Sequence, residues 1–303
     1  MNENEDIFVS SVEQKSMIRV NPDSFMIFAN MYRELKNLYS IEEIMEFWKE
    51  NRNQICKQDQ SRDKILEGSY LKNISGFQKI EKYIHDGGVI YSFHYGNYRA
   101  IYAAIAEVFY YKYPKKILNI IIDKISYEEE PEKYKKQRNI RYIISEKVDV
   151  GIEMIEQLNR GNFVAIFLDG NSGYGVDRNP ITIDFLTSKI KIRSGIFRIM
   201  SKTKKPLFPI IAEGDYQNQK FEVGDNINVG DSQPQELADK CYEILREKMR
   251  RHPEYWRLWF RHNKQILQWN QKDTENYSIA NVFMVHGEKK IGLNLKNGKY
   301  IEL

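Results

Sequence analysis

His94 is the residue whose surroundings best fit chemistry at the end of a strand. The apolar residues 89–93 lead directly into it, and Gly96 and Asn97 follow. Asn97 is a suitable N-cap for the helix-compatible residues 99–108. The pattern therefore predicts a buried strand, a tight turn that carries an imidazole, and a helix. Because ligands in open α/β sheets gather at the carboxyl ends of strands, His94 is a candidate catalytic residue.

A second strand end carries an acid. The segment FVAIFLDG predicts a strand that ends at Asp169 and Gly170, and the loop NSGYGVDRNP follows it. Asp169 is either a turn former or a site residue. Four further strands are predicted, at residues 117–122, 141–144, 181–186 and 206–212.

These strands alternate with segments of helical period. Helices are predicted at residues 22–40, 41–57, 76–85, 99–108, 151–159, 193–202 and 234–251. The charged residues 128–139 are expected to form a solvated helix or loop. The alternation predicts the α/β class, with a mainly parallel central sheet that is flanked by helices on both faces.

Three regions differ in character. Residues 1–21 have no clear period and are expected to be loosely ordered. Residues 22–268 are predicted to form one α/β domain. Residues 269–303 carry turn signals at Gly287 and at Asn297-Gly298 between alternating segments, which predicts an appended β-hairpin element.

Composition excludes several functions. The net charge of +4 and the lack of a nucleic-acid motif argue against DNA or RNA as a partner. Cys56 and Cys241 show no metal-ligand spacing, so we expect free thiols, no metal site and no cofactor. The chain lacks a signal peptide pattern and an apolar run of the ~18 residues that a membrane span needs. A cytoplasmic protein is predicted, with peripheral membrane contact still compatible.

Three segments, taken in order, resemble one family. They are the strand ending in HYGNY, the segment GNFVAIFLDGNSGYG, and HPEYWRLWFRHNK. They are similar to the lysophospholipid acyltransferase superfamily, and within it to the lauroyl/myristoyl acyltransferases of lipid A biosynthesis. That family has a strand ending in His-Phe-Gly-Asn-Trp, a Gly-x-x-Val strand ending in Asp, and a His-Pro-Glu-x-x-x-Trp-x-x-Arg signature. The resemblance covers roughly residues 20–265.

The resemblance implies a glycerolipid acyltransferase-like fold and acyl transfer from a thioester. The donor would be acyl-CoA or an acyl or peptidyl carrier protein, and the acceptor a hydroxyl or amine of a small molecule, lipid or peptide. His94 would act as general base, and the N–H groups of Gly96 and Asn97 could stabilise the oxyanion. The implied substrate-binding residues also include Gly170, Tyr174 and Arg261.

One departure from the family concerns the partner of His94. The family motif is His-x-x-x-x-Asp/Glu, but the matching position here is Arg99, which has no acceptor. Asp169 could orient His94 instead, the acceptor could be an amine that needs weak base assistance, or the site could bind without turnover. Arg99 is either a surface helix residue or a clamp for a phosphate or carboxylate.

The leading prediction is an acyltransferase of a specialised biosynthetic pathway. The alternatives are a non-catalytic relative that binds an acyl or pantetheine-linked ligand or serves as a partner subunit, and a thioester hydrolase. His252 and His262, together with Trp256 and Trp259, are expected to be structural.

Overall fold

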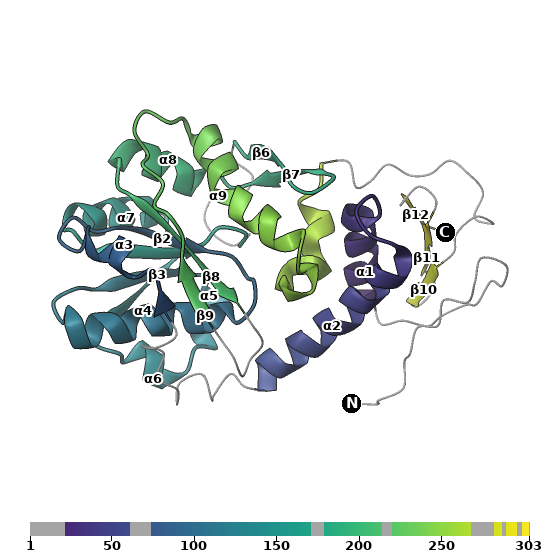
Figure 1. Ribbon diagram of the computed structural model, residues 1–303, viewed down its shortest axis with the longest axis horizontal. Helices are drawn as coiled ribbons and strands as arrows, with labels where there is room; N and C mark the ends of the chain where they lie inside the picture. The colour runs from purple at the N-terminus through teal and green to yellow at the C-terminus, as the bar shows by residue number, and fades with distance from the viewer. Residues whose placement is uncertain are drawn as a thin grey trace. The chain divides into compact units, whose positions relative to one another are not determined.

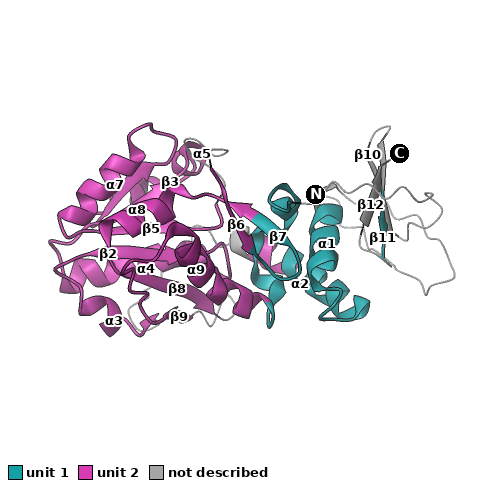
Figure 2. Ribbon diagram, turned by 90° about the horizontal axis from the view of Figure 1, so that it is seen from above, with its two compact units in different colours: residues 1–52, 184–190, 250–303 teal, residues 53–183, 191–249 magenta. Residues whose placement is uncertain are grey.

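The computed structural model describes residues 22–60, 74–170, 179–213, 220–267, 282–286, 289–295 and 299–302. The chain forms two compact units (Figure 2). Unit 1 contains residues 1–52, 184–190 and 250–303, and unit 2 contains residues 53–183 and 191–249. These units do not follow the predicted boundaries at residues 21 and 268. The reason is that the first helix packs on segments near the C-terminus, so the two ends of the chain share a unit.

Unit 2 is built on a seven-stranded sheet with the strand order β1-β9-β8-β2-β5-β3-β4. Every pairing in it is parallel except the antiparallel pair of β8 and β9. The predicted α/β class with a mainly parallel sheet is therefore confirmed. The strands are β1 (Ile74–Ser75), β2 (Gly88–Ser92), β3 (Leu118–Ile122), β4 (Ile140–Ile144), β5 (Phe163–Phe167), β8 (Leu207–Glu213) and β9 (Lys220–Val223).

Helices cover both faces of this sheet. In Figure 1, α7, α8 and α9 lie on one side and α4 and α6 on the other. Side chains alternate along β2 accordingly: Ile90 belongs to the core shared with α4, whereas Tyr91 contacts Cys241 of α9. The helices are α3 (Gln78–Glu81), α4 (Tyr98–Lys112), α5 (Lys124–Glu128), α6 (Glu132–Lys135), α7 (Val150–Asn159), α8 (Gly195–Thr203) and α9 (Pro234–Met249).

Two short strands carry the chain from unit 2 into unit 1 and back. They are β6 (Ile181–Asp184) and β7 (Lys189–Ile192), which form a separate two-stranded sheet. Both alternate strictly between buried and exposed side chains, as a half-buried strand requires. The prediction included β6 but not β7, β1 or β9, and the predicted helix at residues 76–85 is reduced to α3 and turns.

Unit 1 has its own core. One face of α2 (Ile41–Gln60) places Ile44 and Trp48 in the interior. The side-chain amide of Asn51 donates hydrogen bonds to the carbonyl oxygens of Glu254 and Trp256. The remaining elements are α1 (Pro22–Leu35), η2 (Pro253–Tyr255), η3 (Arg257–Lys264), β10 (Val282–His286), β11 (Lys289–Asn294) and β12 (Lys299–Glu302), the last three forming an antiparallel sheet.

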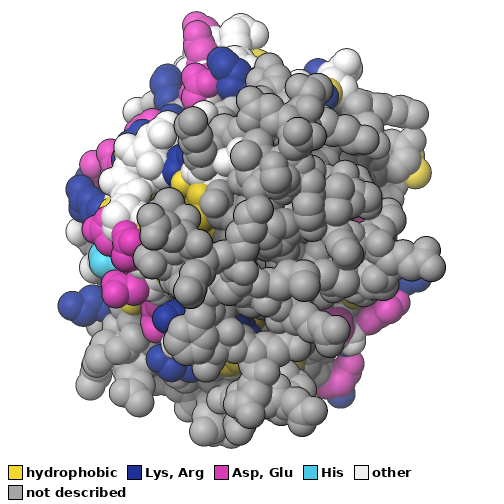
Figure 3. Space-filling model, turned by 90° about the vertical axis from the view of Figure 1, so that its right-hand side faces the viewer, with side chains coloured by type: hydrophobic (Ala, Val, Ile, Leu, Met, Phe, Trp, Pro, Cys, Tyr) yellow, Lys and Arg dark blue, Asp and Glu magenta, His cyan; other side chains and the backbone are white. Residues whose placement is uncertain are grey.

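Surface charge agrees with the small net charge. Among the described residues visible in Figure 3, basic and acidic side chains lie next to one another. None of the described helices is long and apolar enough to cross a bilayer. Cys56 and Cys241 are free thiols, as predicted.

Candidate active site

His94 lies just beyond the carboxyl end of β2. The Tyr95 N–H donates to the carbonyl oxygen of Phe93 at 2.7 Å, which closes a three-residue turn centred on His94. Gly96 then turns the chain into α4 with a φ of +57°, and a Cβ there would lie 2.7 Å from the carbonyl oxygen of Ala212 on β8. Only glycine fits this close approach without strain. The predicted strand, turn and helix around His94 are therefore confirmed.

Asp169 is the partner of His94. The His94 Nδ1 atom lies 2.8 Å from Asp169 Oδ1, and the His94 backbone N–H lies 3.0 Å from Asp169 Oδ2. The two residues meet because β2 and β5 are neighbouring parallel strands, so their carboxyl ends lie side by side. Of the two readings of Asp169, the structure places it in the site, with its side chain 2% exposed.

Two hydrogen bonds to Leu168 hold Asp169 in place. The Leu168 N–H donates to the Ser92 carbonyl oxygen, and the Tyr242 hydroxyl donates to the Leu168 carbonyl oxygen, both at 2.9 Å. A buried carboxylate that accepts from one backbone N–H and one imidazole is well satisfied, which offsets the cost of its burial.

Aromatic rings surround the His94 imidazole. Its centroid lies 4.7 Å from the ring of Phe167 and 4.7 Å from the ring of Tyr98. Phe167 also packs on Tyr102, with a centroid distance of 4.6 Å. The imidazole is nonetheless 20% exposed, so it is held in one orientation and remains reachable.

A cavity of about 490 Å³ opens beside His94. Consecutive residues of β3 line it, and because neighbouring strand residues point to opposite faces, it reaches over both faces of the sheet edge. Tyrosines line it on the α4 side, namely Tyr98, Tyr102, Tyr134 and Tyr142. Aliphatic side chains of α7 and α8 line the other side, namely Met154, Ile196 and Ile199. Its size and lining are typical of a site for a largely apolar ligand.

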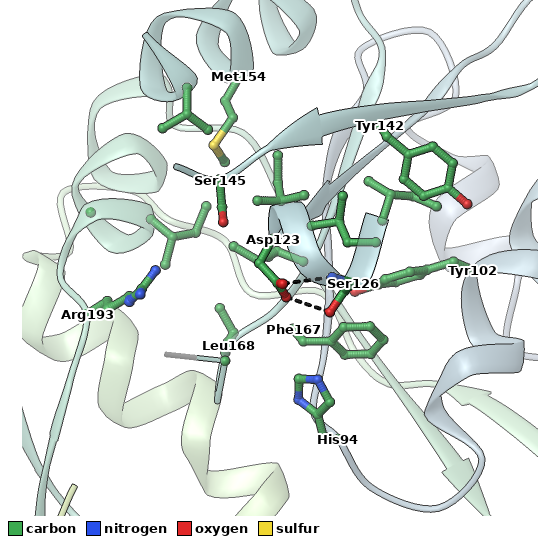
Figure 4. Close-up of a pocket in the computed structure, with 18 of the residues that line it drawn as sticks. His94, Tyr102, Asp123, Ser126, Tyr142, Ser145, Met154, Phe167, Leu168 and Arg193 are labelled. Atoms are coloured by element: carbon green, nitrogen blue, oxygen red, sulfur yellow. Dashed lines mark hydrogen bonds between the residues drawn. The ribbon is translucent and has the colours of Figure 1, made fainter. Parts of the chain in front are cut away.

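Polar groups also reach this cavity from neighbouring strand ends. Asp123 follows β3 and Ser145 follows β4, so both lie at the same edge as His94. Asp123 caps α5 by accepting from the N–H of Ser126 at 2.9 Å and from its hydroxyl at 2.6 Å (Figure 4). Figure 4 also shows Arg193 extending into the pocket.

Arg99 lines the cavity as well. Its Nε donates to the Tyr98 hydroxyl at 3.1 Å, and Tyr98 in turn packs on His94. Arg99 therefore lies at the cavity wall near the imidazole. Together with Arg193 and Arg198 it brings three guanidinium groups to the cavity wall, against the three carboxylates of Asp123, Glu129 and Glu130.

The other predicted binding residues are placed unevenly. Gly170 lines the cavity, and a Cβ there would lie 3.8 Å from His94 Cε1. Gly96 and Asn97 lie next to the site but are not among the cavity-lining residues. Arg261 belongs to unit 1 and is not among the cavity-lining residues. Tyr174 lies outside the described residues.

Sequence reasoning missed the contributions of Tyr102, Asp123, Ser126 and Arg193. A tyrosine inside a helix is ordinarily a core residue, and Asp123 has the signal of a helix cap. The position of Asp123 directly after a predicted strand was the available signal, because strand ends converge at one edge of a parallel sheet.

A second histidine–carboxylate pair lies in unit 1. His262 Nε2 is 2.8 Å from Glu34 Oε1, and both side chains are fully buried. His252 contacts Glu254 at 3.1 Å and is largely exposed. Neither histidine is among the cavity-lining residues.

Among the described residues, no group of three His, Cys, Asp or Glu side chains is arranged to hold a metal ion.

No family model and no curated protein matches the chain. The candidate site therefore consists of the His94–Asp169 pair and the apolar cavity beside it.

Proposed function

We propose that the protein is an acyltransferase that moves an acyl group from a thioester donor to a hydroxyl or amine acceptor. The observation that carries this proposal is the 2.8 Å contact between His94 Nδ1 and Asp169 Oδ1 at the wall of an apolar cavity. The donor would be acyl-CoA or an acyl or peptidyl carrier protein.

The pairing supports His94 as the general base. With Nδ1–H donated to Asp169, the proton-free nitrogen of a neutral imidazole is Nε2. The acceptor O–H or N–H gives its proton to Nε2 as its lone pair attacks the thioester carbonyl carbon. The tetrahedral oxyanion then collapses and the carbon–sulfur bond breaks. The leaving thiolate takes the proton from Nε2. Asp169 holds the tautomer and stabilises the imidazolium that forms between the two steps.

Asp169 thus fills the role that Arg99 cannot. Of the three readings left open by the sequence, the distance between Asp169 and His94 favours the one in which Asp169 orients the base. The aliphatic side of the cavity suits an acyl chain, because burying each methylene group contributes about 0.8 kcal/mol. Arg99, Arg193 and Arg198 suit an anionic group, such as a phosphate of the donor or a carboxylate of the acceptor.

A cytoplasmic location fits this proposal. Both cysteines are free thiols, which agrees with a reducing compartment. The proposal includes membership of the lauroyl/myristoyl acyltransferases, which the sequence resembles. A specialised biosynthetic pathway would supply the acceptor.

The test is thiol release from decanoyl-CoA and from a decanoyl carrier protein, with and without a pool of amine and hydroxyl acceptors. We expect acceptor-dependent release, and a loss of at least about 10³-fold in His94→Ala because the base is removed. The control is His252→Ala, which removes an imidazole that is 60% exposed and outside the cavity, and should retain full activity.

Other outcomes identify the alternatives. Release that does not depend on acceptor indicates a thioester hydrolase, and binding without release indicates a non-catalytic relative. A His94→Ala variant that keeps the wild-type rate would show that the site is wrong.

A further inference from the structure

The Tyr102 hydroxyl is a buried polar group that the proposed mechanism has not used. The residue is 5% exposed, and its hydroxyl has no hydrogen-bond partner among the described residues. Buried hydroxyls are nearly always hydrogen-bonded, because an unsatisfied one costs about 1–3 kcal/mol. An exception at a cavity wall therefore points to a group that arrives with a ligand.

Tyr242 is a second buried tyrosine whose pKa is affected by the charge of Asp169, and it can be compared with Tyr102. Burial raises the pKa of both Tyr102 and Tyr242 well above the ordinary value, and the charge of Asp169 raises both further. Both hydroxyls are therefore protonated donors near Asp169. Tyr242 donates to the Leu168 carbonyl oxygen at 2.9 Å and is satisfied, whereas Tyr102 has no such acceptor among the described residues.

The position of Tyr102 relates it to the base. Tyr98 and Tyr102 are separated by one turn of α4, so both side chains lie on the same face of that helix. The Tyr102 ring packs on Phe167, which packs on the His94 ring. Tyr102 lines the same cavity as His94, and Figure 4 shows its side chain extending toward the middle of the pocket.

We propose that the Tyr102 hydroxyl donates a hydrogen bond to the carbonyl oxygen of the bound thioester and holds the oxyanion that develops on it. This inference rests on the proposed function and adds a catalytic residue to it. When the acceptor attacks, the carbonyl π electrons move onto oxygen, and when the carbon–sulfur bond breaks they return. The phenol keeps its proton throughout and supplies a positioned dipole.

Two other donors that the sequence or the cavity lining suggests are less suited to this role. The N–H groups of Gly96 and Asn97, which the sequence suggested for it, belong to residues that do not line the cavity. The Ser126 hydroxyl does line it, but it already donates to Asp123 at 2.6 Å. Tyr102 therefore combines an available donor with a place on the cavity wall.

The first experiment compares Tyr102→Phe with the wild type in decanoyl thioester turnover. The substitution removes one oxygen atom, so kcat should fall by roughly 10²-fold while KM changes little, because the lost contact matters most in the transition state. Thermal stability should not decrease, since no hydrogen bond of the free protein is lost. Tyr113→Phe is the matched control. Tyr113 lies at the far end of α4, where its hydroxyl bonds to Glu81, so this variant should have an unchanged kcat.

The second experiment does not depend on turnover. Binding of S-(2-oxoundecyl)-CoA, which presents a carbonyl, is compared with binding of S-undecyl-CoA, which has the same chain length and lacks one. The wild type should prefer the ketone by roughly fivefold to tenfold, and Tyr102→Phe should lose this preference without weaker binding of S-undecyl-CoA.

The two experiments separate the two proposals. If the wild type releases no thiol but the ketone preference depends on Tyr102, the proposed function fails and the Tyr102 contact stands. An unchanged kcat in Tyr102→Phe, a change confined to KM, or a wild type without ketone preference would each overturn the assignment.

Discussion

Among the described residues, two histidine–carboxylate pairs share one contact distance and differ in their surroundings. In unit 2, His94 Nδ1 lies 2.8 Å from Asp169, and in unit 1, His262 Nε2 lies 2.8 Å from Glu34. The imidazole of His94 is 20% exposed at a cavity, whereas that of His262 is 0% exposed. His262 packs against the rings of Phe185, Trp256 and Trp259.

The carboxylates also differ in what else they hold. Asp169 accepts from the backbone N–H of His94 in addition to its ring, so it bonds twice to the same residue. Glu34 accepts from the backbone N–H groups of Thr187 and Ser188 as well as from His262, and so joins α1 to residues 184–190 and to η3. A histidine–carboxylate pair is therefore not by itself a catalytic signal. The feature that distinguishes the His94 pair is the cavity beside its ring.

The largest expected effect is on the His94 pair. In Asp169→Asn, the amide can donate to Nδ1 and hold the imidazole with its proton on Nε2, which is the wrong tautomer for a base. We expect acyl transfer to fall by roughly 10³–10⁴-fold, as for other base-orienting carboxylates. Thiol release measures activity, and tryptophan fluorescence should show unchanged unfolding of unit 1, which contains the described Trp48, Trp256 and Trp259. A loss below tenfold would remove Asp169 from the mechanism.

Breaking the second pair should give the reverse pattern. Glu34→Ala leaves a buried imidazole and two backbone N–H groups without their acceptor, so the free energy of unfolding should fall by about 3–5 kcal/mol. Urea denaturation followed by tryptophan fluorescence measures it. The matched control is Glu46→Ala on the exposed face of α2, which should be nearly neutral. A stable Glu34→Ala protein with lost activity would contradict the division of roles.

The smallest expected effect is a pH dependence of unit 1. Burial raises the pKa of the Glu34 carboxyl, but the hydrogen bond and charge of His262 and the hydrogen bonds from Ser188 and Thr187 lower it more. Its pKa therefore lies below the ordinary value, which is about 4.3 in the unfolded chain. The stabilisation is present above that pH and is lost as pH falls through the lower, folded-state pKa.

The measurement is the urea midpoint of unit 1 fluorescence between about pH 5.5 and pH 3. The wild-type midpoint should decrease on acidification more steeply than that of Glu34→Gln, which cannot titrate at this position. Parallel decreases in the two proteins would show that other carboxyl groups determine the acid sensitivity.

Much of the fold and part of the site follow from local pattern. The apolar run before His94 and the run before Asp169 are strands β2 and β5, and both residues stand where the pattern predicts a strand to end. That Asp169 orients His94 was one of three open readings, because 75 residues separate them. Their meeting depends on β5 pairing with β2, and strand order within a sheet is set by how the helices pack.

Other features had no usable local signal. Tyr102 has the sequence pattern of a core residue. Only the tertiary structure shows that it lines the cavity and that its hydroxyl has no hydrogen-bond partner among the described residues. Arg261 is a site residue by resemblance only; it belongs to unit 1 and is not among the cavity-lining residues. The two units interleave along the chain, and no local pattern in the sequence indicates this interleaving.

Residue spacing alone determined that His94 and Asp169 would lie at strand ends, because apolar strands and helical periods can be recognised from neighbouring residues in the sequence. Only the tertiary structure decided that His94 would be reachable and His262 enclosed. Both histidines have a carboxylate at 2.8 Å, and the difference arises from side chains distant in sequence that leave a cavity beside one ring and pack tightly around the other.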